Sequence, residues 1–260
     1  MSETRDLRGQ VALVTGASSG IGEAIAEALA LRGAHVTLAA RRVERLQALA
    51  ERLQQRASGG ETPGETPGET LVVGCDVRDE AQVQAAVRQT LERWGQLDIL
   101  VANAGFGGRG PLVGGDTARW KAMIDTNVYG LLLTLKHGVQ PMLERKRGHV
   151  VVMSSIAGRV TTPGGAAYCG TKAAAAVIAD ALRMEVAPQG VAVTSIEPGV
   201  VISEFQEVAG YSPDIVANML KGSAPLYPPD IARAVVYVCE QPETVTVGDL
   251  TIRGRGQAQP

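Results

Sequence analysis

The sequence VALVTGASSGIG, residues 11–22, decides the fold. It joins a short apolar run, Val11–Thr15, to a glycine-rich turn with the spacing G-x-x-x-G-x-G. Residues 23–31 follow with apolar side chains at helical spacing, which predicts a helix with one buried face. Strand, glycine turn and helix in this order indicate a dinucleotide-binding unit, because glycines let the backbone approach a pyrophosphate and the helix N-terminus faces its negative charge. An ordinary turn between a strand and a helix is the alternative.

The next strand-like segment, residues 34–40, ends at two arginines, Arg41 and Arg42. At this point an Asp or Glu would bind the free ribose hydroxyl of NAD, whereas an arginine suits the 2′-phosphate of NADP. No acid stands here. We therefore predict NADP(H) as the cofactor, with Arg41 favoured over Arg42 as the phosphate ligand. The alternative is that both arginines only begin a solvated helix.

Further apolar segments alternate with helical patterns along the chain. The segments typical of strands are 71–75, 97–102, 150–154, 191–196 and 248–252, and those typical of helices are 43–56, 79–94, 116–145 (with a kink near Pro141), 166–187 and 230–240. Strands that alternate with helices imply right-handed crossovers and a parallel sheet. We predict one doubly wound Rossmann-type α/β domain over residues 1–260. Its sheet has seven parallel strands in the order 3-2-1-4-5-6-7, with helices on both faces and a site at the carboxyl edge.

Three segments do not fit this alternation. Residues 57–69 carry a repeat of Gly, Glu, Thr and Pro, a composition that opposes packing, so we predict a flexible acidic insertion without a catalytic role. Residues 200–229 contain four prolines and predict an irregular substrate lid. Residues 253–260 are expected to form a tail.

Composition excludes several classes of protein. A formal net charge of −2 gives no reason to expect nucleic acid or an anionic membrane as a partner. No apolar run approaches the roughly 18 residues of a membrane span, and the polar residues 1–8 do not resemble a signal peptide. Three widely spaced cysteines argue against disulfides and favour the cytoplasm. His35, His137 and His149 have no partner at ligand spacing, so we predict no metal site.

A candidate proton-transfer group stands at Tyr168 and Lys172. Four residues apart on a helix, they share one face, and a neighbouring ammonium lowers the pKa of a phenol. The phenol then approaches the range of a general acid or base. Ser155 follows the strand-like run 150–154 and could hold a substrate oxygen. A half-buried tyrosine beside a solvated lysine is the alternative.

Three polar residues near the predicted sheet edge have two interpretations each. Asp76 could contact a base edge or cap the following helix, or do both. Asn103 could hold its turn beside the cofactor through backbone hydrogen bonds. Asn127, inside an apolar helical stretch, could be a satisfied core amide or could anchor a water of a proton relay.

These pieces together resemble the short-chain dehydrogenase/reductase family. The matching motifs cover residues 10 to about 205 and are Thr15-Gly16-x-x-x-Gly20-x-Gly22, Asp76, Asn103-Ala104-Gly105, Asn127, Ser155, Tyr168-x-x-x-Lys172 and Pro198-Gly199. Two positions depart from the family pattern: Ala102 stands where Asn is frequent, and Ser203 where Thr is frequent. Ser203 keeps the hydroxyl. The runs 41–46 and 248–253 are similar to the branch of NADP-dependent 3-hydroxy acid dehydrogenases and clavulanate-type aldehyde reductases.

The resemblance implies roles for many residues. Asn127, Ser155, Tyr168 and Lys172 would be catalytic, and the cofactor would contact Gly16, Ser18, Ser19, Gly20, Ile21, Gly22, Arg41, Arg42, Asp76, Val77, Asn103, Ala104, Gly105, Tyr168, Lys172, Pro198, Gly199, Val201 and Ser203. In such an enzyme Lys172 bonds the nicotinamide ribose and Asn127 fixes the relay water. The family also implies a homo-oligomer, a tetramer or a dimer, packed through the helices that carry Asn127 and Tyr168.

The expected activity is hydride transfer between NADP(H) and a carbonyl or alcohol substrate, with Tyr168 as general acid or base. The expected substrate walls are Phe106, Ile156, Pro163, Val200, Phe205, Val208 and Tyr211, with Arg109 and Arg159 as candidate cations for a carboxylate. One rival is a nucleotide-sensing binding protein on the same fold. Another is a dehydratase or epimerase that uses a transient hydride.

Overall fold

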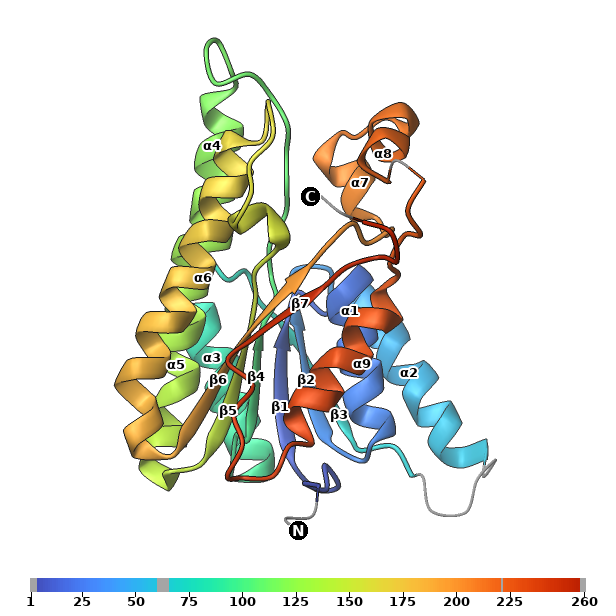
Figure 1. Ribbon diagram of the computed structural model, residues 1–260. Coiled ribbons are helices and arrows are strands. Elements are labelled where there is room, and N and C mark those ends of the chain that lie inside the picture. The colour runs from blue at the N-terminus through green and yellow to red at the C-terminus, as the bar shows by residue number, and fades with distance from the viewer. Residues whose placement is uncertain (1–3, 60–65, 221, 258–260) are drawn as a thin grey trace.

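The protein is built on a seven-stranded parallel sheet with the order β3-β2-β1-β4-β5-β6-β7, as predicted. The computed structural model describes residues 4–59, 66–220 and 222–257. The strands are β1 (Val11–Thr15), β2 (His35–Ala40), β3 (Thr70–Gly74), β4 (Ile99–Ala102), β5 (Gly148–Met153), β6 (Val191–Pro198) and β7 (Asp249–Ile252). Their carboxyl ends meet at one edge, beneath the segment that carries α7 and α8 (Figure 1).

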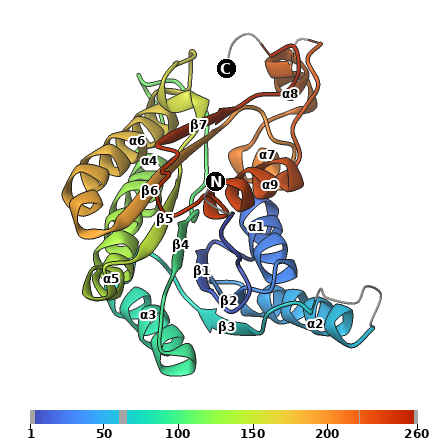
Figure 2. The ribbon, with the colours of Figure 1, turned by 60° about the horizontal axis from the view of Figure 1, so that its bottom comes forward.

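Helices cover both faces of the sheet (Figures 1 and 2). They are α1 (Gly20–Leu31), α2 (Val43–Gly59), α3 (Glu80–Trp94), α4 (Thr117–Ile124), α5 (Gly130–Arg145), α6 (Ala166–Val186), α7 (Phe205–Ala209), α8 (Pro213–Leu220) and α9 (Pro228–Cys239), with short turns η1 (Asp125–Tyr129), η2 (Ile156–Gly158) and η3 (Ala187–Gln189). Helices α1, α2 and α9 lie on one face, and α3, α5 and α6 on the other.

The unbroken apolar pattern of β1 follows from this double cover. Ala12 and Val14 point into the core beneath α1 and α9, whereas Leu13 points into the core beneath α3 and α5. All five residues of β1 are buried. A strand with helices on both faces therefore needs apolar side chains at every position instead of at alternate ones.

Asp76 does not cap helix α3, which was one of the two interpretations of this residue. The N-cap of this helix is Asp79, whose carboxylate accepts hydrogen bonds from the backbone N–H groups of Ala81 and Gln82. Asp76 instead pairs with Arg78, at 2.5 Å between Oδ2 and Nη2. The expectation that Asp76 caps this helix is wrong, because the chain makes a further turn before α3 begins.

The predicted helix 116–145 is interrupted within the apolar stretch around Asn127. Helix α4 ends at Ile124, the π-helical turn η1 follows, and α5 begins at Gly130. Pro141 lies inside α5. A π-helical turn inserts one extra residue and occurs often at functional sites, and this one lies behind the sheet edge predicted to hold the site.

The three segments outside the alternation also differ from expectation. Residues 200–229 are not irregular, because they contain α7 and α8 and reach α9. Residues 253–257 are no free tail: the backbone N–H of Ala224 donates to the carbonyl of Arg255, and Gln257 is buried. In the insertion, α2 extends to Gly59, residues 60–65 lie outside the described residues, and the Gly68 N–H donates to the Ala30 carbonyl.

In the described chain, no helix combines the length and apolarity needed to cross a membrane.

Candidate active site

A cavity of about 1130 Å³ opens at the carboxyl edge of the sheet. All nineteen residues expected to contact the cofactor line this cavity, and so does Ser155. Asn127 does not line it and lies behind its wall. Residues from most of the chain's length thus meet in one space, since the parallel strands all deliver their following loops to the same edge.

The glycine turn after β1 requires its glycines for two different reasons. Gly16 and Gly20 have φ angles of 71° and 60°, in the left-handed region that disfavours other residues. Gly22 is needed for contact, because a Cβ there would lie 2.3 Å from the Gly16 carbonyl oxygen. Asn103 follows β4, the strand beside β1 in the sheet, and holds the turn by donating from Nδ2 to the Thr15 carbonyl at 3.0 Å. This contact matches the structural interpretation of Asn103.

The start of α1 and its surroundings fit the phosphates of a dinucleotide. The N-cap, Ser19, makes no side-chain hydrogen bond to the first turn of α1, so these N–H groups stay available to an anion at the cavity wall. Arg41 lines the same cavity and makes no hydrogen bond or ion pair within the described residues. The N–H groups at the start of α1, the glycine turn and the Arg41 guanidinium, which has no partner in the described residues, could together bind a phosphorylated nucleotide.

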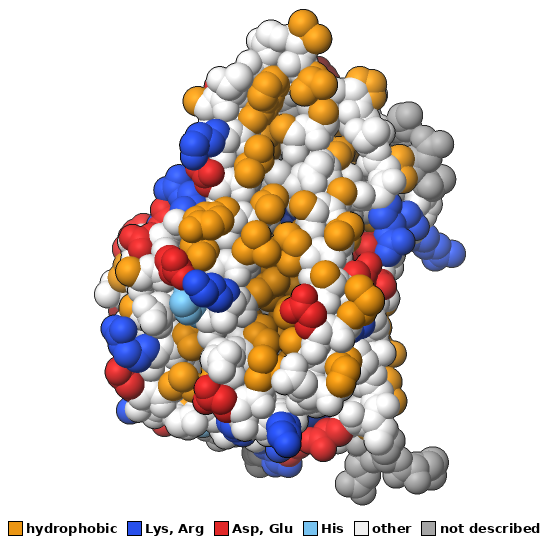
Figure 3. Space-filling model, turned by 90° about the vertical axis from the view of Figure 1, so that its left-hand side faces the viewer, with side chains coloured by type: hydrophobic (Ala, Val, Ile, Leu, Met, Phe, Trp, Pro, Cys, Tyr) orange, Lys and Arg blue, Asp and Glu red, His pale blue; other side chains and the backbone are white. Residues whose placement is uncertain are grey.

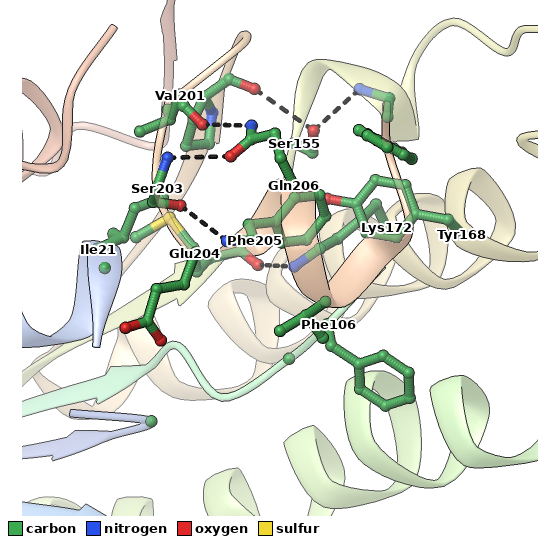
Figure 4. Close-up of a pocket in the computed structure, with 18 of the residues that line it drawn as sticks. Ile21, Phe106, Ser155, Tyr168, Lys172, Val201, Ser203, Glu204, Phe205 and Gln206 are labelled. Atoms are coloured by element: carbon green, nitrogen blue, oxygen red, sulfur yellow. Dashed lines mark hydrogen bonds between the residues drawn. The ribbon is translucent and has the colours of Figure 1, made fainter. Parts of the chain in front are cut away.

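Tyr168 and Lys172 stand one turn apart on α6, with Ser155 opposite (Figure 4). Tyr168 is half-buried at the cavity wall, and desolvation there raises the pKa of the phenol above its ordinary value, while a hydrogen bond with Ser155 lowers it by less. The phenol is therefore protonated at neutral pH. The Ser155 hydroxyl donates to the Pro198 carbonyl at 3.3 Å and accepts from the N–H of Ala157.

Lys172 does not act on Tyr168 as the sequence suggested. Its Nζ donates to the Met153 carbonyl at 2.7 Å, and burial lowers the pKa of this lysine from 10.5 to about 8. Burial, rather than a neighbouring ammonium, dominates the pKa of the phenol. The expected lowering of the Tyr168 pKa by Lys172 is therefore absent in the protein alone.

Asn127 is fully satisfied by protein groups. Its Oδ1 accepts from the N–H of Phe106 at 3.0 Å, and its Nδ2 donates to the Phe106 carbonyl at 2.8 Å and to Thr171 Oγ1 at 3.0 Å. These bonds tie η1 to α6 and to the loop after β4. A second cavity of about 10 Å³ lies between Asn127 and Lys172, close to the volume that one water requires.

Aromatic and aliphatic side chains line the large cavity near Tyr168. Phe205 of α7 lies 5.6 Å from the Tyr168 ring and 6.1 Å from the Tyr211 ring, measured between centroids. The expected wall residues that line the cavity are Phe106, Ile156, Val200, Phe205, Val208 and Tyr211. Pro163 is not among the lining residues, and Arg109 is. Arg159 is committed elsewhere, because its Nε donates to the fully buried Glu197 at 2.6 Å.

Sequence reasoning missed Glu204, the residue after Ser203. Glu204 lines the cavity and pairs with Arg42 and Arg45 from the start of α2. No local spacing could have revealed this contact, since about 160 positions separate the partners. Among residues 4–59, 66–220 and 222–257, no group of three His, Cys, Asp or Glu side chains is placed to hold a metal ion.

Comparisons with known proteins agree with this geometry. The family described as short chain dehydrogenase matches residues 10–211. A glycine betaine reductase of Emericella nidulans is 39% identical over 257 residues, and the chain spans only 19% of its length. An uncharacterised oxidoreductase of Staphylococcus saprophyticus is 37% identical, covering 95% of this chain and 98% of the relative.

Two solved structures in complex with NADP compounds are similar. An alcohol dehydrogenase from the archaeon Thermococcus sibiricus, complexed with 5-hydroxy-NADP, aligns with a TM-score of 0.83 and 31% identity over 96% of this chain and 98% of its own. The closed form of a serine dehydrogenase, complexed with NADP⁺, aligns with a TM-score of 0.82 and 32% identity over 94% of both chains.

Proposed function

The chain belongs to the short-chain dehydrogenase/reductase family, and on that premise we propose that it is an NADP(H)-dependent enzyme that interconverts a carbonyl and an alcohol. The observation that carries this proposal is the meeting of Tyr168, Ser155 and Lys172 with the glycine turn in one cavity. A protein that only senses a nucleotide would need the glycine turn but not the proton-transfer residues.

The residues that line the cavity would hold the nicotinamide, which would supply or accept a hydride at the substrate carbon. Ser155 holds the substrate oxygen, exchanging its present acceptor, the Pro198 carbonyl, for that oxygen. Tyr168, which is protonated at neutral pH, donates its proton to the same oxygen as the carbonyl is reduced. In the opposite direction the phenolate takes the proton back.

Lys172 and Asn127 supply the proton path behind Tyr168. Below about pH 8 the Lys172 amine is mostly protonated, so a cation stands one helical turn from Tyr168 and would favour a transient phenolate. The cavity of about 10 Å³ that Asn127 and Lys172 share supports a single relay water between them. Asn127 acts through position: its bonds to Phe106 and Thr171 hold the wall of that cavity in place.

Arg41 is the best candidate to bind the 2′-phosphate of NADP(H). It lines the cavity at the end of β2, and its side chain makes no hydrogen bond or ion pair within the described residues that a phosphate would have to replace. Arg42 is already bonded to Ser18, Ser19 and Glu204. The two NADP-bound structural neighbours support the same choice of cofactor.

The substrate class follows from the walls near Tyr168. Phe205, Tyr211 and Phe106 offer apolar and aromatic surface. Besides Lys172, Arg109 also lines the cavity, and its Nη2 donates to the Pro163 carbonyl at 2.6 Å. We propose a partly apolar aldehyde or ketone, with room for a carboxylate at Arg109. The alcohol and serine dehydrogenases among the neighbours are compatible with this class.

The first test is consumption of NADPH by the purified protein with a panel of aldehydes, ketones and 3-oxo acids, with NADH in parallel. Tyr168→Phe removes only the hydroxyl and is expected to lower kcat by at least about 100-fold, the usual contribution of a general acid. Tyr237→Phe is the matched control, since Tyr237 is exposed on α9 and outside the cavity.

The rivals give different results in this test. NADPH that binds tightly but is never consumed, in the wild type and across the panel, would favour a nucleotide-sensing protein. Turnover of substrate without net consumption of cofactor would favour a dehydratase or epimerase. Equal activity of Tyr168→Phe and Tyr237→Phe would contradict the role of Tyr168.

We also propose that the protein is a cytoplasmic homo-oligomer, a tetramer or a dimer. Figure 3 shows a band of apolar side chains along the face formed by α4, α5 and α6. Exposed apolar residues of α5 and α6 include Leu132, Val177 and Met184. Light scattering after size exclusion should give a multiple of the 27.1 kDa chain mass, and Val177→Glu should lower it.

A further inference from the structure

Glu204 lines the large cavity at the carboxyl edge of the sheet and pairs there with Arg42 and Arg45. Arg45 Nη1 lies 2.6 Å and 2.8 Å from its two carboxylate oxygens, and Arg42 Nη1 lies 3.2 Å from one of them. In Figure 4 the carboxylate points away from Tyr168 and Lys172. The arginines hold the pKa of Glu204 below its usual range, with the Arg45 hydrogen bond as the main cause, so the carboxylate is charged at neutral pH.

Arg42 connects this carboxylate to the glycine turn. Its Nε donates to Ser18 Oγ at 3.2 Å and its Nη2 to Ser19 Oγ at 2.6 Å. Both serines and both ends of the Arg42–Glu204 pair line the same cavity. We call Arg42, Arg45 and Glu204 the clasp, since it joins the start of α2 to the segment that carries α7.

The clasp places a carboxylate where a phosphate would be recognised. A guanidinium binds carboxylates and phosphates in the same geometry. The N–H groups of Arg42 that bind Glu204 therefore cannot bind a phosphate at the same time. The 2′-phosphate of NADP(H) carries more negative charge than Glu204, and Arg41 stands next to Arg42 with its guanidinium uncommitted. A phosphate at Arg41 would therefore compete with Glu204 for Arg42 and would also be repelled by its charge.

We propose that Glu204 is a specificity-determining residue that competes with the 2′-phosphate for the arginines and so limits the preference for NADPH over NADH. This inference rests on the proposed use of NADP(H). Phosphate binding must displace Glu204 from Arg42 or bind beside it at a cost. NADH, which lacks the phosphate, leaves the clasp in place.

The test measures dissociation constants of NADPH and NADH by fluorescence titration for the wild type, Glu204→Gln and Glu207→Gln. Glu207 is the matched control, because it is exposed on the same helix and its carboxylate has no bonded partner within the described residues. Glu204→Gln should bind NADPH about fivefold more tightly, with NADH changed less than about twofold. The gain should shrink at about 0.5 M NaCl, because the clasp is partly exposed.

The outcomes separate this inference from the proposed function. Weaker NADPH binding by Glu204→Gln, an equal change for both cofactors, or the same gain in Glu207→Gln would overturn the role of Glu204. If the wild type prefers NADPH and Glu204→Gln changes nothing, only the clasp is refuted. If the wild type prefers NADH and Glu204→Gln is unchanged, both proposals are refuted. A preference for NADPH that emerges only in Glu204→Gln supports the clasp.

Discussion

Replacing the buried Lys172 by methionine should change how stability depends on pH. Lys172 is 7% exposed, and burial lowers its pKa to about 8, against 10.5 ordinarily. The folded protein therefore releases this proton near pH 8, whereas the unfolded chain keeps it until about pH 10.5. Because the unfolded state holds more protons in this window, the stability of the wild type rises with pH there.

The magnitude follows from the two pKa values. Between about pH 7.5 and pH 9, release of the Lys172 proton adds about 1.2 kcal/mol to the free energy of unfolding. Cys75 and Cys239 act in the opposite direction, since burial raises their pKa to about 11 and about 12 and the unfolded chain loses these protons first. Both cysteines are present in the wild type and in Lys172→Met, so the difference between the two proteins isolates Lys172.

Urea unfolding followed by tryptophan fluorescence, at equal protein concentration, measures this difference. The wild type should gain about 1 kcal/mol more than Lys172→Met between the two pH values. Lys146→Met, at an exposed lysine, should follow the wild type. Parallel changes in the wild type and Lys172→Met would refute the depressed pKa of Lys172.

Three further substitutions test packing at and around the site. Gly22→Ala should weaken NADPH binding at least tenfold, because its Cβ would lie 2.3 Å from the Gly16 carbonyl oxygen; unchanged titrations would contradict this. A Cβ at Gly170 would meet nothing within 4 Å, so Gly170→Ala should instead raise the free energy of unfolding by about 0.5–1 kcal/mol. A lower free energy of unfolding would contradict the open space around Gly170. Arg159→Leu should lower it by about 2 kcal/mol by leaving Glu197 buried without its cation, and adding Glu197→Gln should restore most of the loss in the same urea assay.

The strands and the glycine turn could be predicted because their cause is local. A strand buried on both faces is mostly apolar, as Val11–Val14 is, and a turn with positive φ favours glycine, as at Gly16 and Gly20. The strand order follows the doubly wound pattern of dinucleotide-binding domains, in which the chain reverses direction along the sheet after β3. The cavity lining followed in turn, since parallel strands deliver their loops to one edge.

The missed features depend on contacts between distant parts of the chain. The π-helical turn at Asn127 is fixed by bonds to Phe106 and Thr171, and helical periodicity cannot show one extra residue. Prolines suggested an irregular lid, yet α8 begins at Pro213, in the first turn, where proline suits a helix. The pairing of Glu204 with Arg42 is equally invisible along the sequence.

The pKa of Tyr168 shows a further limit of sequence reasoning. The spacing to Lys172 was correct, but it carries no information about burial. Desolvation raises the pKa of the phenol, and Lys172 turns its Nζ to the Met153 carbonyl. In our account the neutral phenol carries the proton that carbonyl reduction would consume, but the raised pKa itself does not set the direction of the reaction.

The most direct test of that account uses NADPH labelled with deuterium at the transferred position of the nicotinamide, with a carbonyl substrate found in the panel. We expect one deuterium on the carbinol carbon of each product molecule and one NADP⁺ formed with it, in the wild type and in Tyr237→Phe. Tyr168→Phe should bind the cofactor equally well and yield almost no labelled product. Product without deuterium, or labelled product formed by Tyr168→Phe at the wild-type rate, would contradict hydride transfer coupled to proton donation by Tyr168.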